Sequence, residues 1–325
     1  IFINVSLLFS IIFSSIINIP SDYLTIQEGI NASFDQDTIK VSDGVYSGLG
    51  NTNLNWNGND KHLILISENG PENCIIDGGG DSRGFFFNNS AQDYTDLISG
   101  FTIQNCYAST SGGGIYSKLA SPTFENLILK NNQASVFGGA GYFNESDSQL
   151  SRLLVRDNTS EDSGGALAIG INSNMNLNVS TFIDNQSNSG SGVYLFGGGN
   201  LEISNSIFRS NNQIQDFYFL SVESQNSLSI SFSNIQGGSD QIFTNGNGNF
   251  VFGDGNIDIL TAAFTDDTFS WWENNGSETF TEHVISSTAN GATKIIAMDM
   301  DGDGDIDLIS IAHLDNTISW WENNG

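Results

Sequence analysis

Short apolar runs separated by asparagine, glycine and serine cover most of the chain. Six of these runs lie at residues 101–103, 127–130, 153–155, 180–183, 201–204 and 228–231. Runs of three to five residues that are rich in β-branched and aromatic side chains and bounded by turn residues predict short strands. A helical repeat would need periodic stretches of ten residues or more, with far less glycine.

The same region repeats itself. Pairs of small residues recur in steps of 26, 26 and 27 residues, at Gly112-Gly113, Gly138-Gly139, Gly164-Gly165 and Ser191-Gly192. One such unit is too small to bury a core, but stacked copies can share one. Residues 19–250 are therefore predicted to form a parallel β-helix. About eight coils between Ile39 and Phe250, at about 4.8 Å per coil, would give a rod of about 40 Å.

A polar residue precedes each glycine pair by seven positions: Asn105, Asn131, Asp157 and Asp184. Because equal residues stack in a solenoid, we expect Asn105 and Asn131 to form a side-chain amide ladder. Asp157 and Asp184 would then lie on neighbouring coils as solvated or turn-capping residues. A cation site and an acid/base pair of a hydrolase, with Glu161 and Asp162 nearby, are the alternatives.

The N-terminus combines an apolar leader with an expected helix. Residues 1–18 carry no charge and resemble the apolar core of a truncated signal peptide, with a membrane anchor as the alternative. In the segment that follows, Thr25 and Glu28 fit a capping box. Leu24, Ile26, Ile30 and Phe34 offer the apolar side of a short helix that could cover the open end of the β-helix.

The amino-acid composition limits the classes of partner that the chain can bind. The chain has 9 Lys and Arg against 37 Asp and Glu, for a net charge of −28. This balance excludes a phosphate-driven nucleic-acid binder and argues against docking on anionic membranes. With 40 Asn, 36 Gly and 3 Pro, the chain favours an all-β fold with many turns. Cys74 and Cys106, the two cysteines, are expected to be buried thiols, with a disulfide as the alternative.

Two stretches carry a resemblance to known families. IPSDYLTIQEGINASFDQDTIKVSDGVYSG, followed by LILISENGPENCIIDGGG, resembles the opening of secreted bacterial right-handed parallel β-helix proteins. The pattern of FIDN or LKNN before GGGIY, GGAGY or GGALA is similar to the repeats of polymorphic outer-membrane proteins. The resemblance implies a secreted or surface-exposed β-helix, often adhesive. The pectate lyases share this fold class, but their catalytic signatures are not found here.

A second repeat, with a period of 49, marks a different domain at residues 251–325. IDILTAAFTDDTFSWWENNG starts at Ile257, and IDLISIAHLDNTISWWENNG starts at Ile306. Alternation of apolar and polar residues in LISIAH and TISWW predicts strands. The Trp271-Trp272 and Trp320-Trp321 pairs are compatible with sugar stacking, but we expect one tryptophan of each pair to be buried.

An aspartate loop precedes the second copy. Its carboxylates recur at every second position, at Asp299, Asp301, Asp303, Asp305 and Asp307, with Gly302 and Gly304 between them. Hard oxygen ligands in a flexible loop favour Ca²⁺. We expect Asp305 to contribute its backbone carbonyl and the other four their side chains. In the first copy Phe250 and Phe252 stand at two ligand positions, so Asp254, Asn256 and Asp258 form only a weak second candidate.

The DxDxDGxxD loop followed by DNTISWWENNG resembles VCBS or FG-GAP repeats, which form blades of calcium-binding β-propellers. The resemblance implies a partial propeller of about two blades, joined to the β-helix in a fragment of a longer protein. The function expected is an adhesin or binding scaffold for a polysaccharide or cell-surface ligand, secreted or on the outer cell surface. The alternative is a polysaccharide lyase or glycoside hydrolase on the β-helix flank, although His62, His283 and His313 lie outside the 97–227 repeats.

Overall fold

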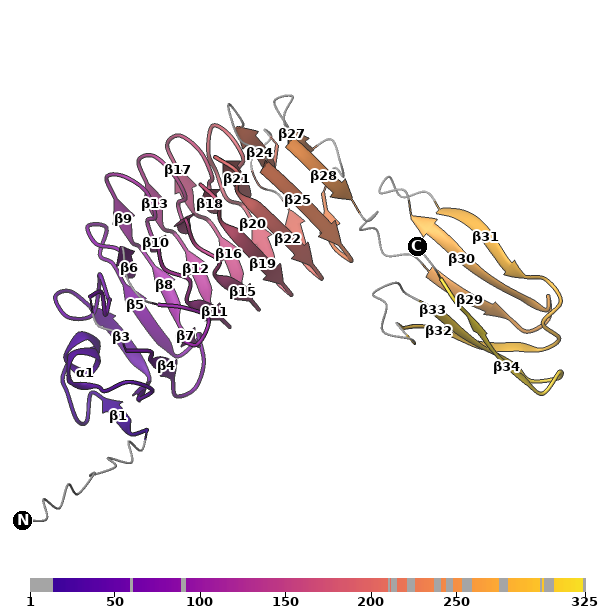
Figure 1. Ribbon diagram of the computed structural model, residues 1–325, viewed down its shortest axis with the longest axis horizontal. Helices are drawn as coiled ribbons and strands as arrows, with labels where there is room; N and C mark the ends of the chain where they lie inside the picture. Colours follow the sequence, from indigo (N-terminus) through magenta and orange to yellow (C-terminus); the bar gives the residue numbers. More distant parts are fainter. Residues whose placement is uncertain are drawn as a thin grey trace, which may run out of the picture.

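The chain folds into a parallel β-solenoid followed by two antiparallel sheets (Figure 1). The computed structural model describes residues 14–58, 61–88, 92–209, 211, 215–220, 226–236, 241–243, 248–252, 259–274, 280–298, 300 and 307–323. Almost all regular structure in these ranges is strand. The all-β prediction is thus confirmed.

Three long parallel sheets, here named A, B and C, form the walls of the solenoid. Sheet A contains β1 (Ile16–Ile19), β2 (Thr38–Val41), β4 (Ile64–Ser67), β7 (Leu97–Ser99), β11 (Thr123–Glu125), β15 (Gln149–Ser151), β19 (Asn174–Asn178), β22 (Asn200–Ser204), β25 (Asn226–Ser231) and β28 (Gly248–Phe252). Sheet B contains β3 (Gly44–Ser47), β5 (Cys74–Asp77), β8 (Thr102–Gln104), β12 (Ile128–Lys130), β16 (Leu154–Arg156), β20 (Thr181–Ile183), β23 (Ile207–Arg209) and β26 (Asn234–Ile235). Sheet C contains β6 (Phe85–Asn88), β10 (Ile115–Lys118), β14 (Gly141–Asn144), β18 (Leu167–Gly170), β21 (Val193–Phe196), β24 (Phe217–Leu220) and β27 (Ile242–Phe243). A short fourth sheet joins β9 (Tyr107–Ala108), β13 (Gln133–Ala134) and β17 (Thr159–Ser160).

The stacking register reproduces the sequence period. Leu129 pairs with Ile103 in the preceding coil and with Val155 in the next, each 26 residues away. Sheet A advances by one strand per coil from β2 to β28, which gives the expected eight or so turns. The predicted domain boundary at residue 250 falls inside strand β28. This strand pairs with β25 and therefore belongs to sheet A of the solenoid.

The core consists of the inward-facing residue of each strand, repeated coil after coil. Leu129, Val155 and Phe182 are fully or almost fully buried. Phe182 stacks on Phe208 of the next coil with ring centroids 4.5 Å apart. Since no coil can bury its own apolar side alone, the stacking of neighbours stabilises the whole array.

Outside the core, sheet C carries a second row of stacked rings. The centroids of Tyr116 and Tyr142 are 5.2 Å apart, and those of Tyr194 and Tyr218 are 5.9 Å apart. Face-to-face stacking at this spacing leaves mainly the ring edges toward solvent. The row therefore stabilises the register of sheet C rather than offering flat faces to a ligand.

The glycines at the corners of the coils confirm the repeat, but they shift the predicted alignment of one coil. Gly112, Gly138, Gly164 and Gly190 have φ angles of 70°, 68°, 71° and 61°. They are therefore equivalent, and the alignment of Ser191 with Gly164 was wrong by one residue. From β16 to β20 sheet B advances by 27 residues, whereas from β18 to β21 sheet C advances by 26. The corner between β20 and β21 is therefore one residue shorter than the one before it.

The amide ladder exists, but one residue later than predicted. Asn105 and Asn131 have φ angles of 51° and 54° and sit at the turn after each sheet B strand. The next residue in four coils forms the ladder: Nδ2 of Asn132 donates to Oδ1 of Asn158, that of Asn158 to Asn185, and that of Asn185 to Asn211, each at 3.0 Å. These side chains are buried. Asparagine is one of the few residues that tolerate the left-handed turn, which explains its presence at the first position.

The N-terminal helix, α1 (Ile26–Ala32), has the predicted capping box. The hydroxyl of Thr25 accepts from the N–H of Glu28, and the carboxylate of Glu28 accepts from the N–H of Thr25. Ile26 and Ile30 are buried as expected. Leu24 and Phe34, however, are 79% and 74% exposed, because both lie beyond the helix ends and turn outward.

Strand β1 starts at Ile16, inside the stretch assigned to the leader, and pairs in parallel with β2. Residues 1–13 lie outside the described part of the chain. Among the residues that the structure describes, no helix has the length and apolarity needed to cross a membrane.

The C-terminal part forms two three-stranded antiparallel sheets. The first contains β29 (Ile259–Ala263), β30 (Thr268–Asn274) and β31 (Phe280–Ser286), and the second contains β32 (Ala292–Met298), β33 (Asp307–Ala312) and β34 (Thr317–Trp321). The strands expected in LISIAH and TISWW are confirmed. The two sequence copies correspond to the β29–β30 and β33–β34 hairpins.

Candidate functional site

The predicted calcium loop is described only at its end. Asp299, Asp301, Asp303 and Asp305 lie outside the described residues, as do Asp254, Asn256 and Asp258 of the weaker first copy.

Asp307, the last of the predicted ligands, begins β33 and is fully buried. Its Oδ1 accepts from the N–H of Asn323 at 2.8 Å, and its Oδ2 accepts from the N–H of Met300 at 3.2 Å. The hydrogen bond from Asn323 is the main reason that the pKa of Asp307 lies below its usual value. The Trp320 side chain gives the carboxylate a third hydrogen bond. One of its four acceptor sites is left, so the carboxylate can still serve as a cation ligand.

The tryptophan pairs depart from expectation, since all four rings are partly exposed. The same member of each pair is anchored: Nε1 of Trp272 donates to the hydroxyl of Thr261 at 3.2 Å, and Nε1 of Trp321 donates to that of Ser310 at 2.8 Å. The other member makes different contacts: Trp271 stacks on His283 with ring centroids 4.3 Å apart, and Trp320, which is 49% exposed, hydrogen-bonds the carboxylate of Asp307. The hydroxyl partner, rather than full burial, therefore distinguishes the two members.

The carboxylates considered for an acid/base pair occupy turns. Asp157 and Asp184 have φ angles of 58° and 56°, in the position that Asn131 occupies one coil earlier. The carboxylate of Asp157 contacts the guanidinium of Arg156. The turn interpretation is thus confirmed for both residues.

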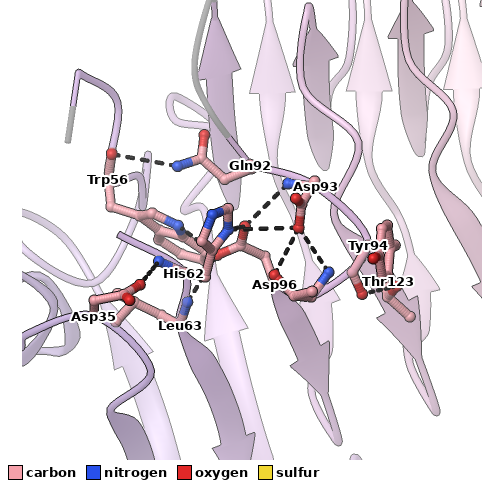
Figure 2. A network of polar contacts seen from close by, with 10 residues as sticks. Asp35, Trp56, His62, Leu63, Gln92, Asp93, Tyr94, Asp96 and Thr123 are labelled. Carbon is pink, nitrogen blue, oxygen red and sulfur yellow. Dashed lines mark hydrogen bonds and ion pairs between the residues drawn. The ribbon is translucent and has the colours of Figure 1, made fainter. Parts of the chain in front are cut away.

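A polar cluster that the sequence did not predict surrounds Asp96, a fully buried carboxylate just before β7 (Figure 2). Its Oδ1 accepts from Nε1 of Trp56 at 2.9 Å and from the N–H of Leu63 at 2.8 Å. Its Oδ2 accepts from the N–H of Asp93 at 3.1 Å and lies 2.9 Å from Nδ1 of His62. Four donors therefore surround one carboxylate.

His62 is the titratable member of this cluster. Its hydrogen bond to Asp96, supported by the charges of Asp93 and Asp35, raises the pKa of the imidazole against the lowering effect of partial burial. Oδ1 of Asp93 lies 3.5 Å from Nδ1 of His62. The ring is thus held in the tautomer that directs an N–H toward Asp96.

The same corner occurs two coils earlier without a histidine. Asp37 stands just before β2, and its oxygens accept from the N–H of Phe34 at 2.8 Å and of Ser15 at 2.7 Å. Burial opposes ionisation of Asp37, but these N–H groups hold its pKa below the usual value. An aspartate that accepts from the residue three before it and from the preceding coil is therefore a recurrent solenoid corner.

The cluster around Asp96 can be either a metal site or a structural corner like that of Asp37. Ligand atoms of His62, Asp93 and Asp96 lie within 4.8 Å of one another, so a metal ion is geometrically conceivable. The four donors already use the acceptor sites of Asp96, however, and an ion would have to replace the Nδ1 proton. The arrangement fits a structural corner that joins neighbouring coils. Its sequence signal is an aspartate directly before an apolar strand, in DTI and DLI.

Both cysteines are free and buried. Burial raises the pKa of each thiol to about 12, which leaves almost no thiolate at neutral pH. The prediction of two buried thiols is confirmed.

Comparison with known proteins adds one family. A model described as an FG-GAP-like repeat matches residues 251–310, so this segment is similar to such repeats. The match covers both copies of the IDI/IDL motif and the aspartate loop. No curated protein and no solved structure matches the chain.

Proposed function

We propose that the chain is a binding scaffold, an adhesin that presents a long solenoid surface to a polysaccharide or cell-surface ligand. The observation that carries this proposal is the continuity of sheet A, which runs without interruption from β1 to β28. A surface built from repeated coils suits an extended partner, because it offers similar groups at a constant spacing of about 4.8 Å.

A right-handed β-helix with α1 as its N-terminal cap completes the proposed architecture. Parallel strands joined by crossovers in one sheet are right-handed in about 98% of cases. The helix packs on β1 and β2, next to the end of sheet A. The likeness to polymorphic outer-membrane repeats and the apolar leader support export to the cell surface or beyond.

We further propose that Asp299, Asp301, Asp303, Asp305 and Asp307 hold Ca²⁺ and stabilise propeller blades of the VCBS or FG-GAP kind. Support comes from the FG-GAP-like match and from the buried Asp307 carboxylate. In the wild type, EDTA should lower the melting temperature of the C-terminal part. The Asp303→Asn variant should have a lower melting temperature than the wild type, and EDTA should change it little. The Glu322→Gln variant, at an exposed position, should melt as the wild type does. A wild-type melting curve unaffected by EDTA, without Ca²⁺ heat in calorimetry, contradicts the site.

A polysaccharide lyase or glycoside hydrolase is the second candidate, favoured only by the His62–Asp96 pair. A buried aspartate that orients a histidine is one part of a nucleophile-activating triad. Among the described residues, the contacts of His62 include no serine, threonine or cysteine side chain. The scaffold therefore remains the better-supported function.

The test combines binding and cleavage. Purified chain is added to immobilised polysaccharides and to whole cells, and retention is measured in parallel with release of reducing or unsaturated ends. Saturable retention without product release is expected. Product release that disappears in His62→Ala would replace the scaffold by the enzyme.

A further inference from the structure

The outward side of sheet A between β15 and β25 consists almost entirely of amide and hydroxyl side chains. We call it the amide face and define it by Gln149, Ser151, Asn174, Asn176, Asn178, Asn200, Glu202, Ser204, Ser227, Ser229 and Ser231, which alternate with the buried apolar residues of the same strands. Glu202 is its one ionisable member. The other members of the face are uncharged, although the carboxylate of Asp147, which accepts from Asn174, lies at its edge.

Hydrogen bonds connect these side chains from coil to coil. Nδ2 of Asn174 donates to Oδ1 of Asp147 at 3.3 Å, and Nδ2 of Asn200 donates to Oδ1 of Asn174 at 2.7 Å. The hydroxyl of Ser227 donates to Oδ1 of Asn200 at 2.6 Å. This row fixes the rotamers of the amides. It uses one of the two N–H bonds of each amide and leaves a second donor for a ligand.

The row borders a hollow of about 230 Å³. The hollow is lined by Asn174, Met175, Asn176, Asn200, Glu202 and Ser227. Drug-sized ligands occupy pockets of about 300 Å³ or more, so this hollow suits one small unit of a larger ligand. Amide donors and acceptors surround it, and the Glu202 carboxylate can accept two hydroxyl groups at once.

We propose that the amide face binds a neutral linear polysaccharide, with one sugar unit seated in the hollow and the chain running across the strands. Fixed amides and one carboxylate match the dense hydroxyl groups of such a chain. A polyanion would be repelled by the acidic protein and by Glu202. Neighbouring sugars of an extended chain advance by a length close to the strand spacing of about 4.8 Å, so successive coils meet successive units. This inference rests on the scaffold function and assigns it a location and a ligand class.

The experiment measures the affinity of the full chain for soluble neutral glucans and mannans and, in parallel, for alginate and pectate. Asn200→Ala and Glu202→Ala remove side chains that line the hollow, and each should weaken binding of the neutral polysaccharide by roughly tenfold. Gln133→Ala is the matched control, because it removes an exposed amide from β13 in the short fourth sheet, outside the amide face, and should change affinity less than twofold. Melting curves establish that each variant is folded.

The outcomes separate this inference from the scaffold function. Neutral polysaccharide binding that is lost in Asn200→Ala and Glu202→Ala but kept in Gln133→Ala supports the proposal. Binding that survives in both hollow variants refutes the site and leaves the scaffold intact. A preference for polyanions, or retention by a cell-surface protein alone, refutes the ligand class. Failure of the wild type to bind any polysaccharide or cell refutes both.

Discussion

The buried amide ladder gives the sharpest test of how the solenoid is held together. Asn158 makes four hydrogen bonds from a fully buried position. Its Nδ2 donates to the carbonyl of Leu129 at 2.9 Å and to Asn185 at 3.0 Å, and its Oδ1 accepts from both the N–H and Nδ2 of Asn132 at 3.0 Å. All the hydrogen-bonding capacity of the amide is therefore used.

Asn158→Ala removes all four bonds at once. At about 1 kcal/mol net for each bond, the free energy of unfolding should fall by about 4 kcal/mol. Urea unfolding followed by circular dichroism measures the change. Asn158→Asp keeps the shape but lacks both donors and buries a charge, so at neutral pH it should destabilise at least as strongly. Gln133→Ala removes an exposed amide from the neighbouring coil and should cost less than about 0.5 kcal/mol.

The result that refutes this reasoning is equally clear. If Asn158→Ala unfolds within about 1 kcal/mol of the wild type, the ladder does not stabilise the array. A loss in Gln133→Ala as large as that in Asn158→Ala would show that the assay reports general sensitivity to amide removal. A reduced m-value would instead show that coils on the two sides of the substitution unfold separately, which a nearest-neighbour array permits.

Three further predictions follow from other parts of the solenoid. The pKa of His62 is raised in the folded chain, so its ion pair with the buried Asp96 carboxylate stabilises the fold below the unfolded pKa of about 6.5 and loses this effect as pH rises through the folded pKa. The difference in free energy of unfolding between wild type and His62→Gln should therefore narrow from pH 5 to pH 9. A difference that stays constant over this range contradicts the prediction. Gly164→Ala should cost several kcal/mol, because φ is 71° and a Cβ would lie 2.5 Å from a backbone carbonyl oxygen, whereas Gly79→Ala, with φ of 63° but open space, should cost about 1 kcal/mol in thermal unfolding. Cys74 and Cys106 should react with a thiol reagent only after denaturation, and rapid labelling of the native chain would disprove their burial.

The solenoid was predictable because its period is written in the sequence. Every coil sets the same inward position against the same neighbours, so Ile103, Leu129 and Val155 recur at a spacing of 26. The glycine corner was predictable for the same reason, until one coil shortened by a residue. In that coil, alignment by residue type selected Ser191-Gly192, but the residue with the equivalent positive φ angle is Gly190.

The cluster around Asp96 was not predictable, because its members belong to different coils. Trp56 and Leu63 precede Asp96 by 40 and 33 residues, outside any local motif. The acid-before-strand pattern at Asp37 and Asp96 is visible only when both strands are known to occupy the same sheet. His62 lies outside the 97–227 repeats, so the regular period gives no signal for it.

The one-residue error in the ladder shows how repeat copies can be read more closely. The two candidate positions are adjacent, and in successive coils they read Asn131-Asn132, Asp157-Asn158 and Asp184-Asn185. The first position accepts Asn or Asp, because either tolerates the left-handed conformation that the turn requires. The second keeps asparagine in these three coils and in the next, at Asn211, because an amide, unlike a carboxylate, both donates to one neighbour and accepts from the other. A position that exchanges amide for carboxylate therefore belongs to a turn, and one that never does belongs to the buried ladder.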